Sequence, residues 1–121
     1  MQKDKKIIER FHVGSALSDM AICHGTVYLA GQVTTDEKLD IVGQTSNVLS
    51  QIDALLAQAG SDKSRILMCQ IFLSDFANFA AMNEVWINWV TPGHTPPRAT
   101  VQTPLLHPEW LIEIVITAAI S

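Results

Sequence analysis

The segment Arg65–Leu73 constrains the fold more than any other, because after its arginine it reads Ile-Leu-Met-Cys-Gln-Ile-Phe-Leu. Successive side chains of a β-strand point to opposite faces of its sheet. A run that is apolar on both faces therefore predicts a strand that is covered on both sides. Any fold for this chain must supply an apolar layer on each side of residues 65–73.

Two segments have the apolar spacing of an amphipathic helix. The first runs from Gly43 to Ala59, and Gly60 follows it as a residue that commonly ends a helix. The second covers residues 76–90, and Asp75 precedes it as a capping residue. Their apolar stripes consist of Val48, Ile52, Leu55 and Ala59 in the first helix, and of Phe79, Met82, Trp86 and Trp89 in the second.

The remaining apolar segments predict strands. These are residues 20–23 and 26–33, which flank a turn at His24-Gly25, and residues 98–103 and 111–119, with residues 7–12 as a less regular candidate. Without that candidate, the order of elements is β-β-α-β-α-β-β, in one domain that spans residues 1–121. Strand–helix–strand crossovers are nearly always right-handed, so both helices can lie on the same face of the sheet. The sequence thus predicts an α+β fold.

Two helices on one face leave the other face of residues 65–73 without cover. Hydrophobic residues make up 48% of the chain and charged residues only 17%, whereas about a quarter of residues are charged in a typical soluble domain. The simplest way to cover the second face is another copy of the same chain. We therefore expect a homo-oligomer, although this pattern does not define the number of subunits.

Charge and cysteine content exclude several classes of function. The formal net charge is −4, and no basic run follows the short stretch from Lys3 to Lys6. This charge balance argues against nucleic acid and membrane surfaces as partners. No segment has the ~20 apolar residues that span a bilayer, and no apolar segment of a secretory signal follows the N-terminal charges. Cys23 and Cys69 lie in apolar runs, which predicts buried thiols in a reducing compartment, the cytoplasm. The four histidines lack metal-ligand spacing, so we expect no metal site.

Arg98 and Glu113 are the charges that most need an explanation, because both lie in stretches otherwise suited to burial. Removing a charge from water costs several kcal/mol, on the order found for real proteins, unless a partner compensates it. Side chains alternate along a strand, so Arg98, Thr100 and Gln102 share one face of theirs. If residues 98–103 and 111–119 form a hairpin, Arg98 and Glu113 can lie on the same face.

This pair suggests a chemistry. A guanidinium binds a carboxylate through two parallel hydrogen bonds, and a nearby carboxylate can orient or deprotonate a water molecule. Together they can hydrolyse a substrate that carries a carboxylate. A structural ion pair between strands or subunits explains the same residues, and spacing does not decide between the two. Gly31, at the end of a predicted strand, permits a ligand's close approach or a bulge.

The chain resembles the RidA/YjgF family of reactive imine and enamine deaminases, whose older label is endoribonuclease L-PSP. The likeness covers nearly the whole chain, with characteristic motifs at Val27–Val33, Ile52–Leu56, Ala59–Gly60, Phe79–Trp86, Pro97–Val101 and Ile112–Ile114. It implies a chorismate mutase-like fold, in which two helices back a mixed sheet. It also implies a homotrimer with a central barrel and three clefts between subunits.

The resemblance assigns roles to individual residues. Arg98 matches the arginine that holds the substrate carboxylate, Glu113 the glutamate that positions the attacking water, and Gly31 a backbone position in the cleft. Three further substrate-binding positions differ from the archetype of the family, which has tyrosine, serine and cysteine where this chain has Leu17, Ala30 and Thr100. The chain therefore resembles a divergent branch of the family.

The resemblance implies hydrolytic deamination of 2-imino acids, or of their 2-aminoacrylate (enamine) tautomers, to 2-keto acids and ammonia. Such a 2-iminobutanoate/2-iminopropanoate deaminase uses no cofactor. One alternative is a trimer that binds a small carboxylate for regulation, without turnover. Glu113 favours the enzyme, because a binding site for carboxylates gains nothing from a second, repelling carboxylate, whereas the lost hydroxyl at Leu17 favours the binding protein. An endoribonuclease is least favoured, given the acidic balance and the lack of a histidine pair.

Overall fold

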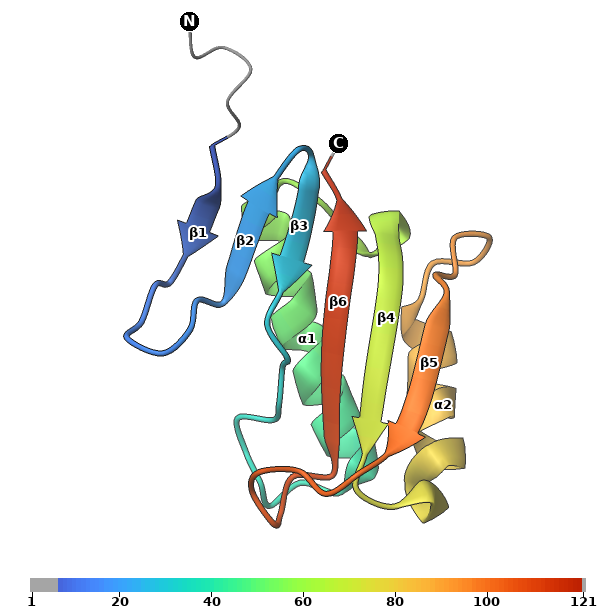
Figure 1. Cartoon of the computed structure of the whole chain (residues 1–121). Coiled ribbons are helices and arrows are strands. Elements are labelled where there is room, and N and C mark those ends of the chain that lie inside the picture. The colour runs from blue at the N-terminus through green and yellow to red at the C-terminus, as the bar shows by residue number, and fades with distance from the viewer. Residues whose placement is uncertain (1–6, 121) are drawn as a thin grey trace, which may run out of the picture.

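The computed structural model describes residues 7–120, so the lysine-containing stretch before Ile7 lies outside the described residues. One six-stranded sheet and two α-helices make up the fold (Figure 1). The elements are β1 (Glu9–Phe11), β2 (Met20–Cys23), β3 (Thr26–Leu29), α1 (Ile41–Ala59), β4 (Ile66–Leu73), α2 (Phe79–Trp89), β5 (Arg98–Gln102) and β6 (Ile112–Ala119). Two short 3-10 helices, Lys63–Arg65 and Phe76–Asn78, precede β4 and α2.

The sheet is mixed, with the strand order β1-β2-β3-β6-β4-β5. Strands β4 and β5 are parallel, and each of the other neighbouring pairs is antiparallel. Both helices lie behind the sheet in Figure 1, on the same face. The predicted α+β fold is therefore confirmed. The less regular candidate at residues 7–12 forms β1, which pairs with β2 and adds one strand before the predicted order.

Local capping explains where the helices begin and end. The Asp40 side chain accepts a hydrogen bond from the backbone N–H of Gly43, so α1 begins at Ile41, two residues before the predicted start. Gly60 ends this helix as predicted, with the left-handed φ of 81° that glycine adopts readily. Asp75 caps the 3-10 helix Phe76–Asn78, and α2 continues from it at Phe79.

The hydrophobic core lies between the helices and the sheet. Its fully buried members include Val48, Ile52 and Leu56 of α1, Met82 of α2, Ile71 and Leu73 of β4, and Ile112, Ile114 and Ile116 of β6. Val48, Ile52 and Met82 belong to the apolar stripes predicted for the helices, and Leu56 widens the stripe of α1. The others come from one alternation of the central strands. Side-chain alternation thus places half of each central strand in the core.

The opposite face of the sheet is apolar but has no cover within the chain. We call this surface the open sheet face. It includes Met68, Phe72, Tyr28 and Val101, and Tyr28 remains 52% exposed. A register shift between β4 and β6 near Ile66 and Met68 also leaves Leu67 half exposed. The face that the sequence predicted to need a second apolar layer is therefore uncovered in the single chain.

A buried glutamine ties α1 to the segment that leads into β6. The Gln44 side chain is fully buried, and its Nε2 donates hydrogen bonds to the backbone oxygens of Leu39 and Glu109, at 3.0 Å each. Its Oε1 accepts a hydrogen bond from the backbone N–H of Leu111 at 2.9 Å. Gln44 thereby anchors residues 103–111, which connect β5 to β6.

Replacing Gln44 with leucine should strongly destabilise the protein. The change leaves Leu39, Glu109 and Leu111 each with an unpaired backbone group, and the free energy of unfolding should fall by about 3 kcal/mol. Thr45→Val is the matched control, because Thr45 is equally buried and its hydroxyl has no hydrogen-bond partner. Chemical denaturation should show unchanged or increased stability for Thr45→Val. Equal losses for the two variants would contradict the anchoring role of Gln44.

Candidate functional site

Arg98 and Glu113 do not lie on a hairpin, because β4 separates their strands (Figure 1). Arg98 is aligned with Cys69 of β4, and Glu113 with Phe72 of the same strand. Cys69 and Phe72 are an odd number of residues apart and point to opposite faces. The hypothesis that the two charges share a face within one chain is therefore wrong. The connection through residues 103–111 carries the chain across β4, so consecutive strands are not neighbours.

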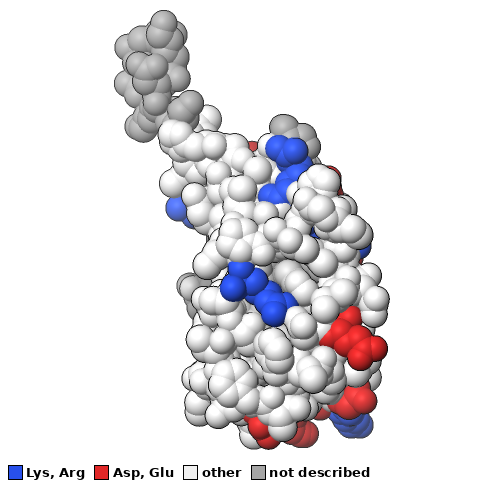
Figure 2. Space-filling model, turned by 90° about the vertical axis from the view of Figure 1, so that its right-hand side faces the viewer, with Lys and Arg blue, Asp and Glu red and all other residues white. Residues whose placement is uncertain are grey.

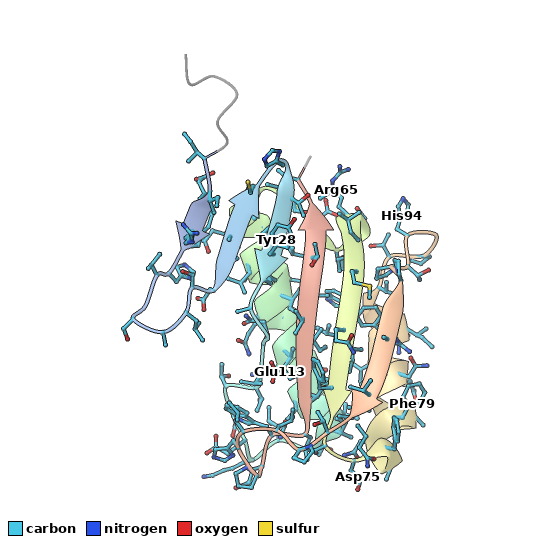
Figure 3. All side chains as sticks on the ribbon, in the orientation of Figure 1. Tyr28, Arg65, Asp75, Phe79, His94 and Glu113 are labelled. Carbon is cyan, nitrogen blue, oxygen red and sulfur yellow. The ribbon has the colours of Figure 1, made fainter. Side chains whose placement is uncertain are left out.

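Arg98 points toward α2 and is held there by three side chains. Its Nη1 donates a hydrogen bond to Oδ1 of Asn83 at 2.8 Å. The guanidinium carbon lies 5.3 Å from the ring centroid of Trp86 and 5.9 Å from that of Phe79, which Figure 3 labels on α2. Cation–π attraction and the hydrogen bond to the Asn83 side chain partly compensate the positive charge of Arg98. No carboxylate pairs with Arg98 among residues 7–120, so most of its donors remain available for an anion.

Thr100 and Cys69 lie on the same face as Arg98. The Thr100 hydroxyl is buried and has no hydrogen-bond partner in the described chain. Burial raises the pKa of the Cys69 thiol to about 12, although the positive charge of Arg98 acts in the opposite direction. A thiol with this pKa is protonated at neutral pH and is a poor nucleophile. Cys69 is a free, buried thiol as predicted, whereas Cys23 is free but only half-buried.

Glu113 lies on the open sheet face (Figure 3). Its carboxylate lies directly against Gly31. Gln32 and Ile114 exchange two backbone hydrogen bonds of 2.9 and 3.1 Å, which bring Gly31 beside the beginning of β6. A Cβ atom on Gly31 would lie 1.9 Å from Oε2 of Glu113. The glycine thus permits close approach, as the sequence suggested, but the approaching group is the protein's own carboxylate.

The Glu113 side chain lines a cavity of about 360 Å³, which we call the Glu113 pocket. The pocket brings together four of the six predicted site residues and excludes Arg98 and Thr100. Its lining consists of Leu17, Asp19, Ala30, Gly31, Gln32, Val33, Gln51, Leu106, Trp110 and Glu113. The predicted site is therefore divided into two halves, one at this pocket and one at the Arg98 side of β5.

Most polar side chains of the pocket are already bonded within the chain. Asp19 contacts Nδ1 of His12 at 2.5 Å, Gln32 donates to the backbone oxygen of Ala30 at 3.0 Å, and Gln51 donates to that of Val33 at 2.8 Å. Within residues 7–120, no hydrogen bond or ion pair involves the Glu113 carboxylate. Glu113 is thus the charged group of the pocket that remains available to a water molecule or ligand.

Sequence reasoning missed several residues of the pocket. Asp19 lines the cavity, at a position where Ser18-Asp19 fits either a turn or the polar edge of a site and the turn was favoured. Leu106 and Trp110 lie on the connection before β6, where no periodicity marks a residue as part of a site. Their proximity in the chain to Glu113 is the one signal that could have indicated them. The described residues include no cluster of acidic, histidine and cysteine side chains suited to a metal ion, and no described helix is long and apolar enough to cross a membrane.

Known proteins resemble this chain along almost its whole length. A family model described as "Endoribonuclease L-PSP" matches residues 8–120. A RutC family protein of Haemophilus ducreyi is 48% identical over 115 residues, which cover 95% of this chain and 98% of the relative. The RutC family protein YoaB of Escherichia coli is 45% identical over 113 residues, with coverage of 93% and 98%.

Solved structures share the fold closely. The crystal structure of a member of the YjgF protein family from Neisseria meningitidis has a TM-score of 0.92 and 40% identity, covering 95% of this chain and 96% of that one. An uncharacterized protein from Pseudomonas aeruginosa has a TM-score of 0.93 and 38% identity, covering 95% and 100%. These similarities apply to the whole architecture, including both halves of the divided site.

Gly31→Ala should destabilise the protein through its contact with Glu113. The new methyl group must displace the carboxylate, and overpacking of this kind costs about 1–3 kcal/mol. In a Glu113→Ala background the three clashing atoms are absent, so the same substitution should cost little. Chemical denaturation of the four proteins in this double-mutant cycle measures the coupling. Equal costs of Gly31→Ala in both backgrounds would show that the contact is not the reason for glycine at this position.

Proposed function

We propose that this chain, which belongs to the RidA/YjgF family, also called endoribonuclease L-PSP, hydrolyses 2-imino acids to 2-keto acids and ammonia. One observation carries the proposal: the chain presents an available carboxylate, Glu113, in a pocket, and an available guanidinium, Arg98, on a different surface. Hydrolysis of a substrate that carries a carboxylate requires both groups in one site. They can meet when two copies of the chain associate.

We propose that the site lies between subunits of a homotrimer, with Arg98 from one subunit and the Glu113 pocket from its neighbour. Two features support this arrangement. The open sheet face leaves Tyr28, Met68 and Val101 exposed, and association would bury them. The side of the molecule with β5 and α2 carries few charged side chains (Figure 2), so a partner can approach the Arg98 half without desolvating many ions.

In the proposed reaction, the substrate carboxylate binds the guanidinium of Arg98 through two hydrogen bonds. Glu113 accepts a proton from a water molecule as the water oxygen attacks C2 of the imine. The resulting tetrahedral intermediate then loses ammonia, as the C2–N bond breaks and the oxygen forms the carbonyl of a 2-keto acid. Glu113 delivers this first proton to the imine nitrogen, which gives the amino group of the intermediate. The hydroxyl proton of the intermediate then passes through Glu113 to the same nitrogen, so that it leaves as ammonia. No electrons are transferred to or from the protein, so the proposed reaction needs no cofactor.

A second candidate function is the binding of a small carboxylate for regulation, without turnover. Leu17 supports it, because this residue contributes an apolar side chain to the Glu113 pocket where the family archetype contributes a hydroxyl. An endoribonuclease, as the label of the family model suggests, has less support, since the chain has a net charge of −4 and the Glu113 pocket contains no cation. We further propose a cytoplasmic location, because Cys23 and Cys69 are both free thiols.

Arg98→Ala should abolish the binding of small 2-keto acids, such as pyruvate and 2-ketobutyrate. Loss of a hydrogen-bonded charge from such a contact costs about 2–5 kcal/mol of binding free energy. Arg98→Lys keeps the charge but loses the planar fork, so it should weaken binding less than alanine does. Isothermal titration calorimetry measures both effects, with Arg65→Ala as a control that removes an exposed arginine elsewhere. If Arg98→Ala binds these acids as tightly as wild type, Arg98 is not the carboxylate anchor.

A complementation experiment tests whether the site is shared between subunits. Arg98→Ala removes the half of the site that binds the carboxylate. Glu113→Gln removes the other half, because a neutral amide cannot accept the proton of water. A general base typically contributes about 10²–10⁴-fold to the rate. Any cyclic trimer that contains both variants has one boundary at which both halves are intact. Such trimers should therefore recover about a third of wild-type activity.

The variants are coexpressed with two different tags, and trimers that carry both tags are purified. Activity is measured with imines generated by an amino-acid oxidase and trapped by semicarbazide, while light scattering gives the mass of the assembly. Each variant alone serves as the inactive reference. Mixed trimers as inactive as the parents would contradict a shared site. A mass equal to one 13.3-kDa chain would contradict the trimer.

A further inference from the structure

The Glu113 pocket has an apolar wall that the deamination of a small imino acid does not require. Leu106 is 97% exposed, which is more than for any other large hydrophobic residue in the described part of the chain. Leu17 is 62% exposed, and both side chains line the same cavity as Trp110 and Glu113. Single exposed apolar residues are common on protein surfaces. Several of them around one available carboxylate instead define a binding surface.

Besides the Glu113 carboxylate and the indole N–H of Trp110, the side chains of the pocket offer few polar groups to a ligand. Asp19, Gln32 and Gln51 are bonded to His12 and to the backbone of Ala30 and Val33, respectively, as described above. A substrate with a polar side chain would lose hydrogen bonds to water on entering and would find few replacements. An apolar side chain has no hydrogen bonds to water to lose, and it buries apolar surface against Leu17, Leu106 and Trp110.

The segment that presents Leu106 and Trp110 is folded onto itself and onto α1. The backbone N–H of Glu109 donates to Nδ1 of His107 at 3.1 Å, and that of Trp110 donates to the His107 backbone oxygen at 3.1 Å. The rings of His107 and Trp110 have centroids 5.4 Å apart. Gln44 holds the segment at Glu109, as described above. The apolar wall is therefore built before a ligand arrives, which limits the entropy lost on binding.

In the single chain, the space beside Glu113 exceeds what a two- or three-carbon acid occupies. The Glu113 pocket measures about 360 Å³, within the range of sites for drug-sized ligands. A second hollow of about 210 Å³ adjoins it, and Leu106 and Glu113 line both. Its other residues include Phe72, Pro104 and Leu105, which are also apolar. Leu106 thus stands between two apolar hollows that meet at the carboxylate.

We infer that the substrate is a 2-imino acid with a branched aliphatic or aromatic side chain, which packs against Leu17, Leu106 and Trp110 while C2 lies at Glu113. This inference rests on the proposed function and narrows its substrate class. Leu106 and Leu17 act as specificity residues, since they contact the side chain of the substrate and not its reacting atoms. The alanine-derived imine leaves this wall unoccupied and should be a poorer substrate.

The test compares imines generated by an amino-acid oxidase from alanine, leucine and phenylalanine. Wild type should have a kcat/KM about tenfold or more higher for the leucine-derived than for the alanine-derived imine, the discrimination typical of a few methylene groups in an apolar pocket. Leu106→Ser and Leu17→Ser should each reduce this ratio several-fold. Val42→Ser is the matched control, because Val42 is 46% exposed on α1, away from the pocket lining, and its replacement should leave the ratio unchanged.

Equal or higher kcat/KM for the alanine-derived imine, or an unchanged ratio in both leucine variants, would overturn the inference while leaving the proposed function intact. Absence of turnover for every imine would instead contradict the proposed function. Calorimetry then decides the question of side-chain preference by comparing 4-methyl-2-oxopentanoate with pyruvate. Tighter binding of the branched acid, diminished in Leu106→Ser, would support the apolar wall, and equal binding of the two acids would refute it.

Discussion

The position of β4 between β5 and β6 is the constraint from which the rest of the structure follows. Its side chains alternate between a fully buried set, Cys69, Ile71 and Leu73, and a set on the open sheet face that includes Met68 and Phe72. The buried set requires the two helices on one side. The other set has no comparable cover within the chain. The same strand that organises the core therefore also presents apolar side chains that a partner subunit could bury.

The same alternation separates the two charges of the candidate site. Register with β4 directs Arg98 toward α2 and Glu113 toward the open sheet face. No rotation of side chains can bring the two groups together through a sheet, because its backbone and the buried residues lie between them. The division of the site and the uncovered sheet face are therefore two consequences of one strand. Under the proposed function, association of subunits both completes the site and covers the open sheet face.

Local features of this chain were predictable from the sequence, whereas the order of strands was not. Periodicity identified both helices, and Gly60 marked the end of α1, because these features depend on residues close together in the chain. The stripe predicted for α1 is buried, whereas in α2 Met82 and Trp86 are buried but Phe79 is exposed. Strand order depends on contacts distant in sequence. Consecutive strands usually pair, which made a hairpin of β5 and β6 a reasonable but wrong hypothesis. The segment 103–111 between them is long enough to pass β4, and nothing in its composition shows that it does.

The candidate site shows the same limit. The chemistry of Arg98 and Glu113 could be inferred from residue type alone, and the close approach at Gly31 from the absence of a side chain. The identity of the approaching group required the bridge between Gln32 and Ile114. Leu106 and Trp110 required the cavity itself, since their exposure has no periodic signature. Residues that act through three-dimensional proximity to a site leave the weakest trace in a single sequence.

The contact between Gly31 and Glu113 has a consequence for how such a chain can evolve. While the glutamate is present, its carboxylate occupies the space that any side chain at position 31 would need. Once a lineage loses the glutamate, a side chain at position 31 no longer meets the carboxylate, and substitutions there become easier. A later return of glutamate would then meet an occupied space, so the loss becomes difficult to reverse. A residue other than glycine at position 31 of a descendant would thus indicate that the glutamate at position 113 had been lost earlier.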